Sequence, residues 1–190
     1  MDGMKSQDIV VLLKLVSLQE QEKQANFSKQ ALSGEDAHSV RGLESLLGIS
    51  KTEINASIKR SSLSGLLTKD RDTGRPKPNR RSLHNFIVHG LKFTFPATAG
   101  AMTRGMRTAF AAPMLRSELI SGGEYIYVWP FAEGRDIGQS VKPLFKSVPE
   151  ASQKDERLYE YLALIDAIRL GNQRETNLAG ELLSQRLLNK

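Results

Sequence analysis

Apolar residues recur at helical spacing in the first third of the chain and predict helices there. In residues 4–19 the apolar positions 9, 12, 13 and 16 form one stripe, which is typical of a helix with one buried face. Residues 39–47 carry a second stripe, at positions 40, 43, 46 and 47. Residues 50–62 predict a further helix, whose buried positions are Ile54 and Ile58.

The connection between the last two of these helices is short and well defined. Gly48 ends the earlier helix, because glycine readily takes the left-handed conformation found just past many helix ends. Ser50 then starts the next helix, and Glu53 three residues later completes a capping-box pattern. Two short helices joined in this way predict a helix-turn-helix.

A β-hairpin and another helix are predicted to follow. Residues 66–79 contain a short apolar segment and a turn, and predict a small hairpin. Pro76 and Pro78 weaken its second strand, so a degenerate hairpin is the alternative. Residues 80–94 predict a helix that Pro96 ends.

The second half of the chain shows less periodicity. Residues 97–150 are rich in small residues and predict an irregular layer packed on the helices, with residues 125–130 as a candidate strand. Residues 158–170 and 175–188 predict helices. The expected fold class is mostly α with a small β-hairpin wing. It divides into a winged helix-turn-helix at residues 1–96 and a C-terminal helical layer at residues 97–190, which we expect to serve dimerisation or to bind an effector or partner.

Basic residues concentrate in the predicted helix-turn-helix and hairpin. Residues 41–81 contain ten Lys or Arg and four Asp or Glu, an excess that equals the net charge of +6 of the whole chain. A local basic excess on an otherwise balanced chain indicates a polyanionic partner, and a solvated basic loop is the alternative. Double-stranded DNA fits both this charge and the predicted winged helix.

The predicted recognition helix carries small polar and basic residues opposite its buried positions. The expected contacts of this helix with DNA are Lys51, Thr52, Asn55, Ala56, Lys59 and Arg60. Asn55 is the best candidate for reading an adenine edge, and Thr52 and Ala56 suit a thymine methyl group. Lys51, Lys59 and Arg60 suit phosphates.

The predicted wing supplies further phosphate contacts, at Lys69, Arg71, Arg75, Lys77, Arg80 and Arg81. Arg75 is the expected minor-groove residue of this group. Contacts of this kind make DNA affinity fall steeply with salt concentration. The alternative is an ordinary helical hairpin followed by a solvated turn.

Residues 40–67, VRGLESLLGISKTEINASIKRSSLSGLL, resemble the helix-turn-helix of MarR-type winged-helix transcriptional regulators. The resemblance rests on Leu43, Leu47, Gly48, Ile49, Ser50, Ile54, Ile58, Gly65 and Leu66. It departs at Glu44, where those proteins usually have a small residue that permits close helix packing. The segments NRRSLHNFIVHGLKFTFP, TRGMRTAFAAP, VWP, KPLFKSVPEA and LYEYLALIDAIRLG resemble an uncharacterised bacterial winged-helix family, which implies no established activity.

Other chemistry is weakly supported by the sequence. The chain has no cysteine, and His84 and His89 are five residues apart, so neither a metal site nor a cofactor is expected. Arg104 and Arg107, in the run TRGMRT, are candidates for an anion or effector site. Their alternative is a surface turn in which both arginines pair with carboxylates of the last helices. No pattern of a nucleophile with its base occurs, and an enzyme is not expected.

These observations together predict a bacterial transcription regulator, a repressor or autoregulator, that binds double-stranded DNA. A homodimer is expected, with residues 5–19 and 155–188 as its interface, because two-fold related recognition helices read two half-sites. No apolar run approaches the roughly 18 residues that span a bilayer, and the absence of cysteine favours the cytoplasm. The alternatives are an antitoxin-like protein-interaction module and a sensor of small anions.

Overall fold

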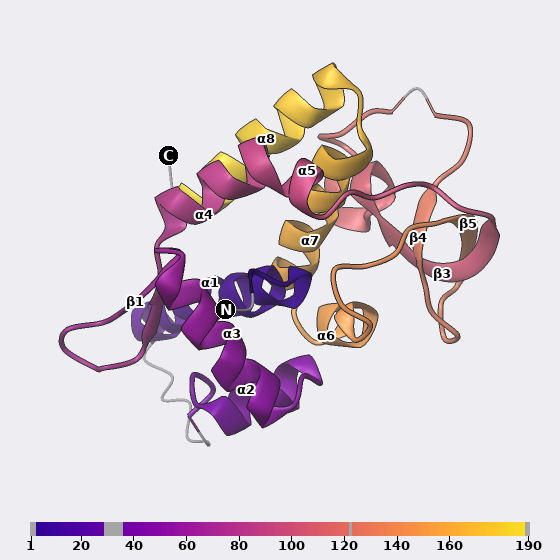
Figure 1. Cartoon of the computed structure of the whole chain (residues 1–190). Coiled ribbons are helices and arrows are strands. Elements are labelled where there is room, and N and C mark those ends of the chain that lie inside the picture. The colour runs from indigo at the N-terminus through magenta and orange to yellow at the C-terminus, as the bar shows by residue number, and fades with distance from the viewer. Residues whose placement is uncertain (1–2, 29–35, 122, 189–190) are drawn as a thin grey trace.

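The computed structural model describes residues 3–28, 36–121 and 123–188. Its first helix, α1 (Ser6–Ser28), continues past residue 19, where the sequence is compatible with either an extension of the helix or a loop. Every residue from Asp8 to Leu18 is buried, so α1 has no solvent-exposed face over that stretch. This helix lies in the middle of the molecule (Figure 1), where elements from both halves of the chain pack against it.

The predicted helix-turn-helix is present. It consists of α2 (Val40–Leu47) and α3 (Lys51–Leu63), and Gly48 between them has a left-handed φ of 63°. The Ser50 side chain accepts a hydrogen bond from the Glu53 backbone N–H at 3.4 Å, which caps α3 as predicted. The Glu53 carboxylate instead accepts a hydrogen bond from Gln7 on α1, so it fixes α3 against α1.

The predicted hairpin consists of β1 (Leu67–Lys69) and β2 (Pro76–Pro78), paired antiparallel with Thr68 opposite Lys77. Backbone hydrogen bonds link residues 79 and 66 and residues 70 and 75, on either side of that pair. Both prolines of β2 therefore occupy the positions whose nitrogen faces away from β1, so neither removes a hydrogen bond from the ladder. The loop of this wing projects from the body of the molecule (Figure 1).

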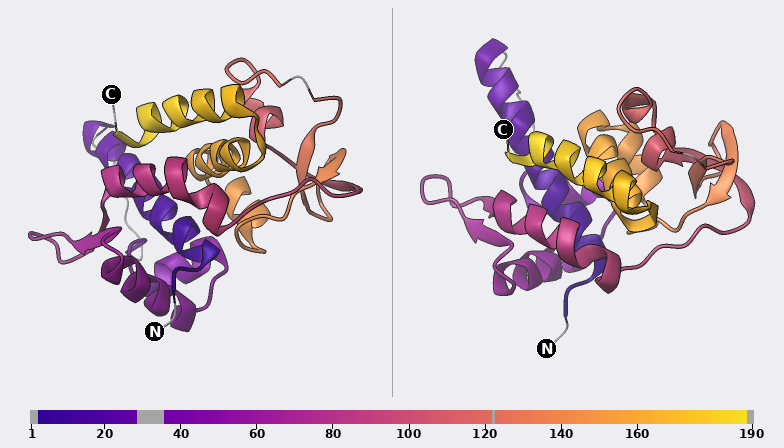
Figure 2. Two further views of the ribbon diagram at one scale, coloured as in Figure 1. Left: turned by 45° about the horizontal axis from the view of Figure 1, so that its top comes forward. Right: turned by 90° about the horizontal axis from the view of Figure 1, so that it is seen from above.

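The helix predicted at residues 80–94 is also present, and it has a wide turn in its middle. It runs through α4 (Arg80–Phe86), the π-helical turn η1 (Ile87–Leu91) and α5 (Lys92–Thr94). Its inward face buries Leu83, and both ends of the π-helical turn are buried as well. Helix α8 (Gln173–Leu188) lies alongside α4 in both views (Figure 2).

A second sheet replaces the irregular layer expected after residue 97. Its strands are β3 (Met102–Thr108), β4 (Tyr127–Pro130) and β5 (Asp136–Ser140), and each pairs with the other two. Strand β3 runs antiparallel to both others, whereas β4 and β5 are parallel. A Cβ atom on Gly105 would collide with the Trp129 carbonyl, so the close packing of β3 on β4 requires glycine at this position. Glycine is uncommon inside strands, and Gly105 therefore weakens the sequence signal for β3.

Short helices connect this sheet to the C-terminal helices. The single-turn helices η2 (Ala109–Ala111) and η3 (Pro113–Leu115) follow β3, and α6 (Val148–Gln153) precedes α7 (Glu156–Leu170). Helix α7 is buried from Tyr161 to Arg169 and packs on α1. The fold is mostly α with a small β part, as predicted. No helix within the described residues is long and apolar enough to cross a membrane.

The helices predicted to form a dimer interface are instead the core of one chain. Residues 8–18 of α1 and most of α7 are buried in the monomer, so they present no surface to a second copy. Of the predicted interface, α8 has an outer face. It is polar, with the exposed residues Gln173, Arg174, Asn177, Glu181 and Gln185.

Buried charges hold the central helices together. The Lys14 ammonium on α1 bonds the Asp155 carboxylate at 2.7 Å, and Ser17 also donates to that carboxylate. Asp155 caps α7 as well, because it accepts from the Leu158 N–H at 3.0 Å. Burial by itself raises the pKa of Asp155, but the hydrogen bonds and the charge of Lys14 outweigh burial and hold this pKa below its usual value.

Candidate nucleic-acid interface

The outer face of α3 is polar, basic and continuous. Lys51, Thr52, Asn55 and Lys59 are exposed, and Ala56 is half-buried at the edge of the same face. At about 100° per residue these positions cover somewhat less than half of the helix circumference. The single acid of α3, Glu53, lies on the other side, where it contacts α1. We define this set of five residues, 51, 52, 55, 56 and 59, as the α3 face.

Arg60, predicted to contact phosphate, lies on the buried side of α3. Its guanidinium donates two hydrogen bonds to Asp8, from Nε at 2.8 Å and from NH2 at 2.7 Å. The Arg60 side chain is 8% exposed and that of Asp8 is 0% exposed. Arg60 therefore attaches α3 to α1, and we leave it out of the DNA-contacting set.

Arg80 is also an internal contact. Its NH1 bonds Glu20 at 2.6 Å and its NH2 bonds Gln19 at 2.9 Å, both on α1. A further hydrogen bond reaches the backbone carbonyl of Leu187 at the end of α8. With a side chain only 17% exposed, Arg80 connects three helices and is not presented to solvent.

The turn of the wing is organised by Asp70. Its carboxylate accepts hydrogen bonds from the backbone N–H and hydroxyl of Thr73, from the Asp72 N–H and from the Lys77 ammonium at 3.0 Å. The Thr73 backbone hydrogen bond, followed by that of Lys77, lowers the pKa of Asp70 well below its usual range. Lys77 is therefore partly neutralised within the wing.

Arg75 is held against α1 instead of extending from the wing. Its NH1 bonds Glu22 at 2.9 Å, and its NH2 lies 3.2 Å from the Asp36 carboxylate. The same Glu22 carboxylate lies 3.1 Å from Nε2 of the buried His38. Arg75, the residue predicted to enter the minor groove, thus forms internal ion pairs in the free protein.

The remaining cations of the wing region are available to a partner. Lys69 on β1, Arg71 in the turn and Arg81 on α4 are exposed, and none of their side chains forms an ion pair or hydrogen bond with another described residue. Together with Lys59 they form the unneutralised positive charge of the predicted interface. The structure thus reduces the predicted set to the α3 face, these three cations and the partly neutralised Lys77 and Arg75.

Glu44 faces the beginning of α3. Its carboxylate accepts a hydrogen bond from the Lys51 backbone N–H at 3.2 Å and lies 3.8 Å from the Lys51 ammonium. This carboxylate occupies a backbone donor at a helix N-terminus that would otherwise suit a phosphate. The Glu44 side chain is 39% exposed, so it does not lie between α2 and α3.

Arg104 and Arg107 do not form one anion site. Both lie on strand β3, where successive side chains point to opposite faces, so residues three apart diverge. Arg107 pairs with Asp136 at 2.5 Å, and Arg104 donates to the Gly134 carbonyl at 3.4 Å. Neither pairs with a carboxylate of the last helices, which was the alternative.

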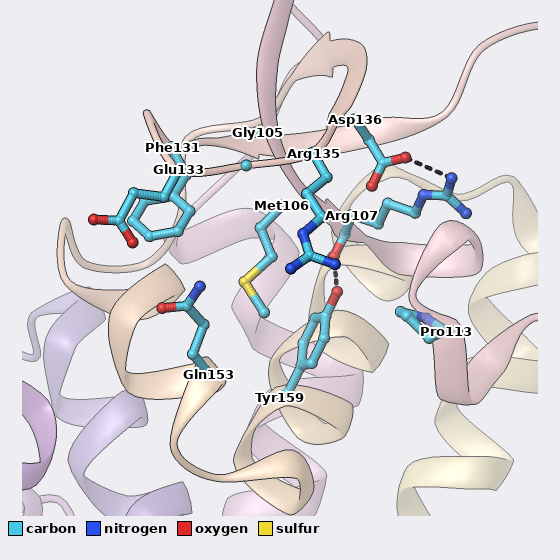
Figure 3. Close-up of a pocket in the computed structure, with 11 residues that line it drawn as sticks. Gly105, Met106, Arg107, Pro113, Phe131, Glu133, Arg135, Asp136, Gln153 and Tyr159 are labelled. Carbon is cyan, nitrogen blue, oxygen red and sulfur yellow. Dashed lines mark hydrogen bonds and ion pairs between the residues drawn. The ribbon is translucent and has the colours of Figure 1, made fainter.

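A cavity of about 330 Å³ lies beside Arg107 (Figure 3). It was not predicted, because it forms between β3, the loop joining β4 to β5, and the helices α6 and α7. Tyr159 lines it and donates a hydrogen bond to the Arg107 backbone carbonyl at 2.6 Å. Burial raises the pKa of Tyr159 to about 12, so its hydroxyl remains a neutral donor at physiological pH.

Comparisons of the chain with protein-family models, with curated proteins and with solved structures found no match. The resemblance to MarR-type regulators therefore rests on the residues of this chain alone. Within the described residues no group of three or more His, Asp and Glu side chains is arranged to hold a metal ion.

Proposed function

We propose that this protein binds double-stranded DNA sequence-specifically through the α3 face and the wing, as a transcription regulator. The observation that carries the proposal is the α3 face, a continuous exposed surface with no acid on it. It belongs to a helix-turn-helix whose wing carries the exposed cations Lys69 and Arg71. In DNA-binding proteins of this architecture the second helix enters the major groove and reads base edges.

The proposed contacts differ in what they contribute. Asn55 lies near the centre of the α3 face, where its amide can bond both polar atoms of an adenine edge. Lys59, Lys69 and Arg71 are unneutralised, so they contact phosphates and contribute affinity without sequence preference. Arg75 joins them once a phosphate has replaced its carboxylate partners Glu22 and Asp36, which are themselves partly exposed.

Binding to a pool of random-sequence duplexes tests this proposal. We expect wild-type affinity to fall steeply with salt, because phosphate contacts release counterions. In the double variant K59A/R71A the slope of log affinity against log salt becomes shallower by roughly 0.9 for each lost phosphate contact. In duplexes selected by the wild type, N55A loses preference at one position, worth about 1–3 kcal/mol.

The control is K154A, which removes an exposed lysine on the side of α6 and α7 and should leave the salt slope unchanged. The proposal is wrong if the wild type does not bind duplex at low salt, or if K59A/R71A binds with the same slope as K154A. If binding is present but selection yields no preferred sequence, only the sequence-specific part of the proposal is lost.

Replacing Glu44 should strengthen DNA binding. In E44Q the beginning of α3 loses a negative charge, and Lys51 loses its ion-pair partner and gains freedom to contact phosphate. We expect affinity to rise about threefold to tenfold at low salt and the gain to shrink as salt increases. The check is to measure the DNA affinity of E44Q and of the control E150Q, in which an exposed acid on α6 is neutralised. Equal affinity of the two variants would contradict the prediction.

We propose a homodimer on DNA, since two-fold symmetry matches paired half-sites. The interface must lie outside the buried parts of α1 and α7. Exposed apolar side chains that such an interface would cover are Phe93 on α5, Ile120 after η3 and Ile137 on β5.

A further inference from the structure

We propose that the cavity beside β3 binds a small organic monocarboxylate with a flat apolar body, and that Arg135 is the residue that pairs with its carboxylate. This proposal is independent of DNA binding. It rests on the direction of Arg135, on the charge balance of the cavity wall and on the apolar residues around it (Figure 3).

Arg135 is placed over the cavity by a tight loop. The loop joins β4 to β5, and the Gly134 N–H bonds the Phe131 carbonyl at 3.0 Å. A Cβ atom on Gly134 would collide with the backbone of Gly105 on β3, so the loop is packed directly against the sheet. Figure 3 shows the guanidinium of Arg135 reaching between Met106 and Tyr159. Such packing fixes the backbone of the loop that carries Arg135 before any ligand arrives, so the loop itself need not be ordered on binding.

The cavity has one positive charge without a partner. Arg107 is neutralised by Asp136 at 2.5 Å, whereas Arg135 forms no ion pair or hydrogen bond with any other described residue. Glu133 also lines the cavity, but its carboxylate points away from Arg135 (Figure 3). One available guanidinium, with the Glu133 carboxylate on the same wall, matches a single negative charge better than the double charge of a phosphate.

The rest of the wall suits an apolar body. Apolar surface comes from Phe131, Met106 and Pro113. The Tyr159 ring is held in place by the hydrogen bond of its hydroxyl and by packing on Trp129, with the two ring centroids 5.6 Å apart. Gln153 adds a side-chain amide that bonds no other described residue and can bond the carboxylate or a ring substituent. The cavity volume of about 330 Å³ lies at the lower end of the range for small-ligand pockets.

Titration with benzoate, benzamide and inorganic phosphate tests the proposal. Calorimetry and the NMR signal of the Trp129 indole N–H monitor binding in each titration. We expect wild-type protein to bind benzoate with a Kd of about 1 mM or tighter. Benzamide, which has the same shape without the charge, and phosphate should each bind about tenfold more weakly or worse. R135Q should weaken benzoate binding by about tenfold or more, since it removes a charge-assisted hydrogen bond.

The matched control is R174Q, which removes an exposed arginine on α8 that does not line the cavity. It should bind benzoate as the wild type does, and the unfolding curve of R135Q should overlay that of R174Q. The proposal is overturned if wild-type protein shows no saturable benzoate binding, if benzamide or phosphate binds as tightly as benzoate, or if R135Q retains wild-type affinity.

Discussion

D155N should lower the free energy of unfolding by roughly 3–5 kcal/mol at pH 7, the cost of removing one partner of a buried ion pair. The substitution leaves Lys14, whose side chain is 3% exposed, without a carboxylate. Asparagine is a good N-cap, so the capping of α7 by residue 155 should survive and the loss reports the charge alone. Urea unfolding of the full chain measures the difference.

The sign of the pH dependence follows from the lowered pKa of Asp155. A depressed carboxyl pKa stabilises the fold at every pH above the unfolded value of about 3.9, and this contribution is lost as pH falls below that value. The gap between wild type and D155N should therefore be full at pH 7 and at pH 5, and should shrink below about pH 4.

Two further variants separate this explanation from a general sensitivity of the α6–α7 junction. E156Q neutralises the exposed neighbouring acid and should cost less than about 1 kcal/mol. K14M/D155N should be more stable than D155N, because the uncompensated ammonium is gone. If D155N unfolds at the same urea concentration as E156Q, the Lys14–Asp155 ion pair does not stabilise the fold.

R60M should destabilise the protein by a similar amount, roughly 3–5 kcal/mol. Asp8 is fully buried, and without the bidentate guanidinium its carboxylate keeps, among the described residues, the Lys5 backbone N–H at 2.8 Å as its hydrogen-bond donor. We expect the double variant D8N/R60M to recover part of this loss, since it removes the stranded charge. Chemical denaturation of the three proteins provides the measurement.

The neighbouring substitution K59M is the control for R60M. Lys59 is exposed on the α3 face, so K59M should leave unfolding unchanged within about 0.5 kcal/mol while it weakens DNA binding. R60M should affect both properties, and its DNA binding should return in D8N/R60M as far as stability does. If R60M is as stable as the wild type but has lost DNA affinity, Arg60 contacts DNA after all.

These two ion pairs show how the halves of the chain are connected. Asp8 joins α1 to α3 of the helix-turn-helix, and Lys14, six residues further along α1, joins it to α7. Helix α1 thus carries both attachments on its buried surface. The winged helix and the C-terminal layer share this helix and do not form two independently packed units, although the sequence divides them near residue 96.

The second sheet marks where sequence reasoning fails in this chain. Strands β4 and β5 are short and parallel, and their pairing with β3 joins residues that lie far apart in the sequence. Gly105 and Gly138 are needed for close backbone approach, yet in a sequence they argue against strands. Arg135 and Tyr159, the residues that define the cavity, consequently carried no recognisable signal.

Local interactions allowed the sequence by itself to determine the helix-turn-helix. Gly48, Ser50 and the apolar spacing of α2 and α3 act within a few residues of one another, so a short segment contains the information. The exposed positions of the α3 face follow from the same spacing. The proposed DNA binding depends on the α3 face, and the variants of Lys59, Arg71 and Asn55 test it.

The tertiary structure alone decided which charged residues are available. Arg60, Arg75 and Arg80 look like the other basic residues of the segment in the sequence, but each meets a carboxylate of α1. Burial of a charge depends on partners more than fifty residues away along the chain, and no local pattern encodes such a partner. For the same reason the cavity beside β3 could be found only after the sheet and α7 had been placed against each other.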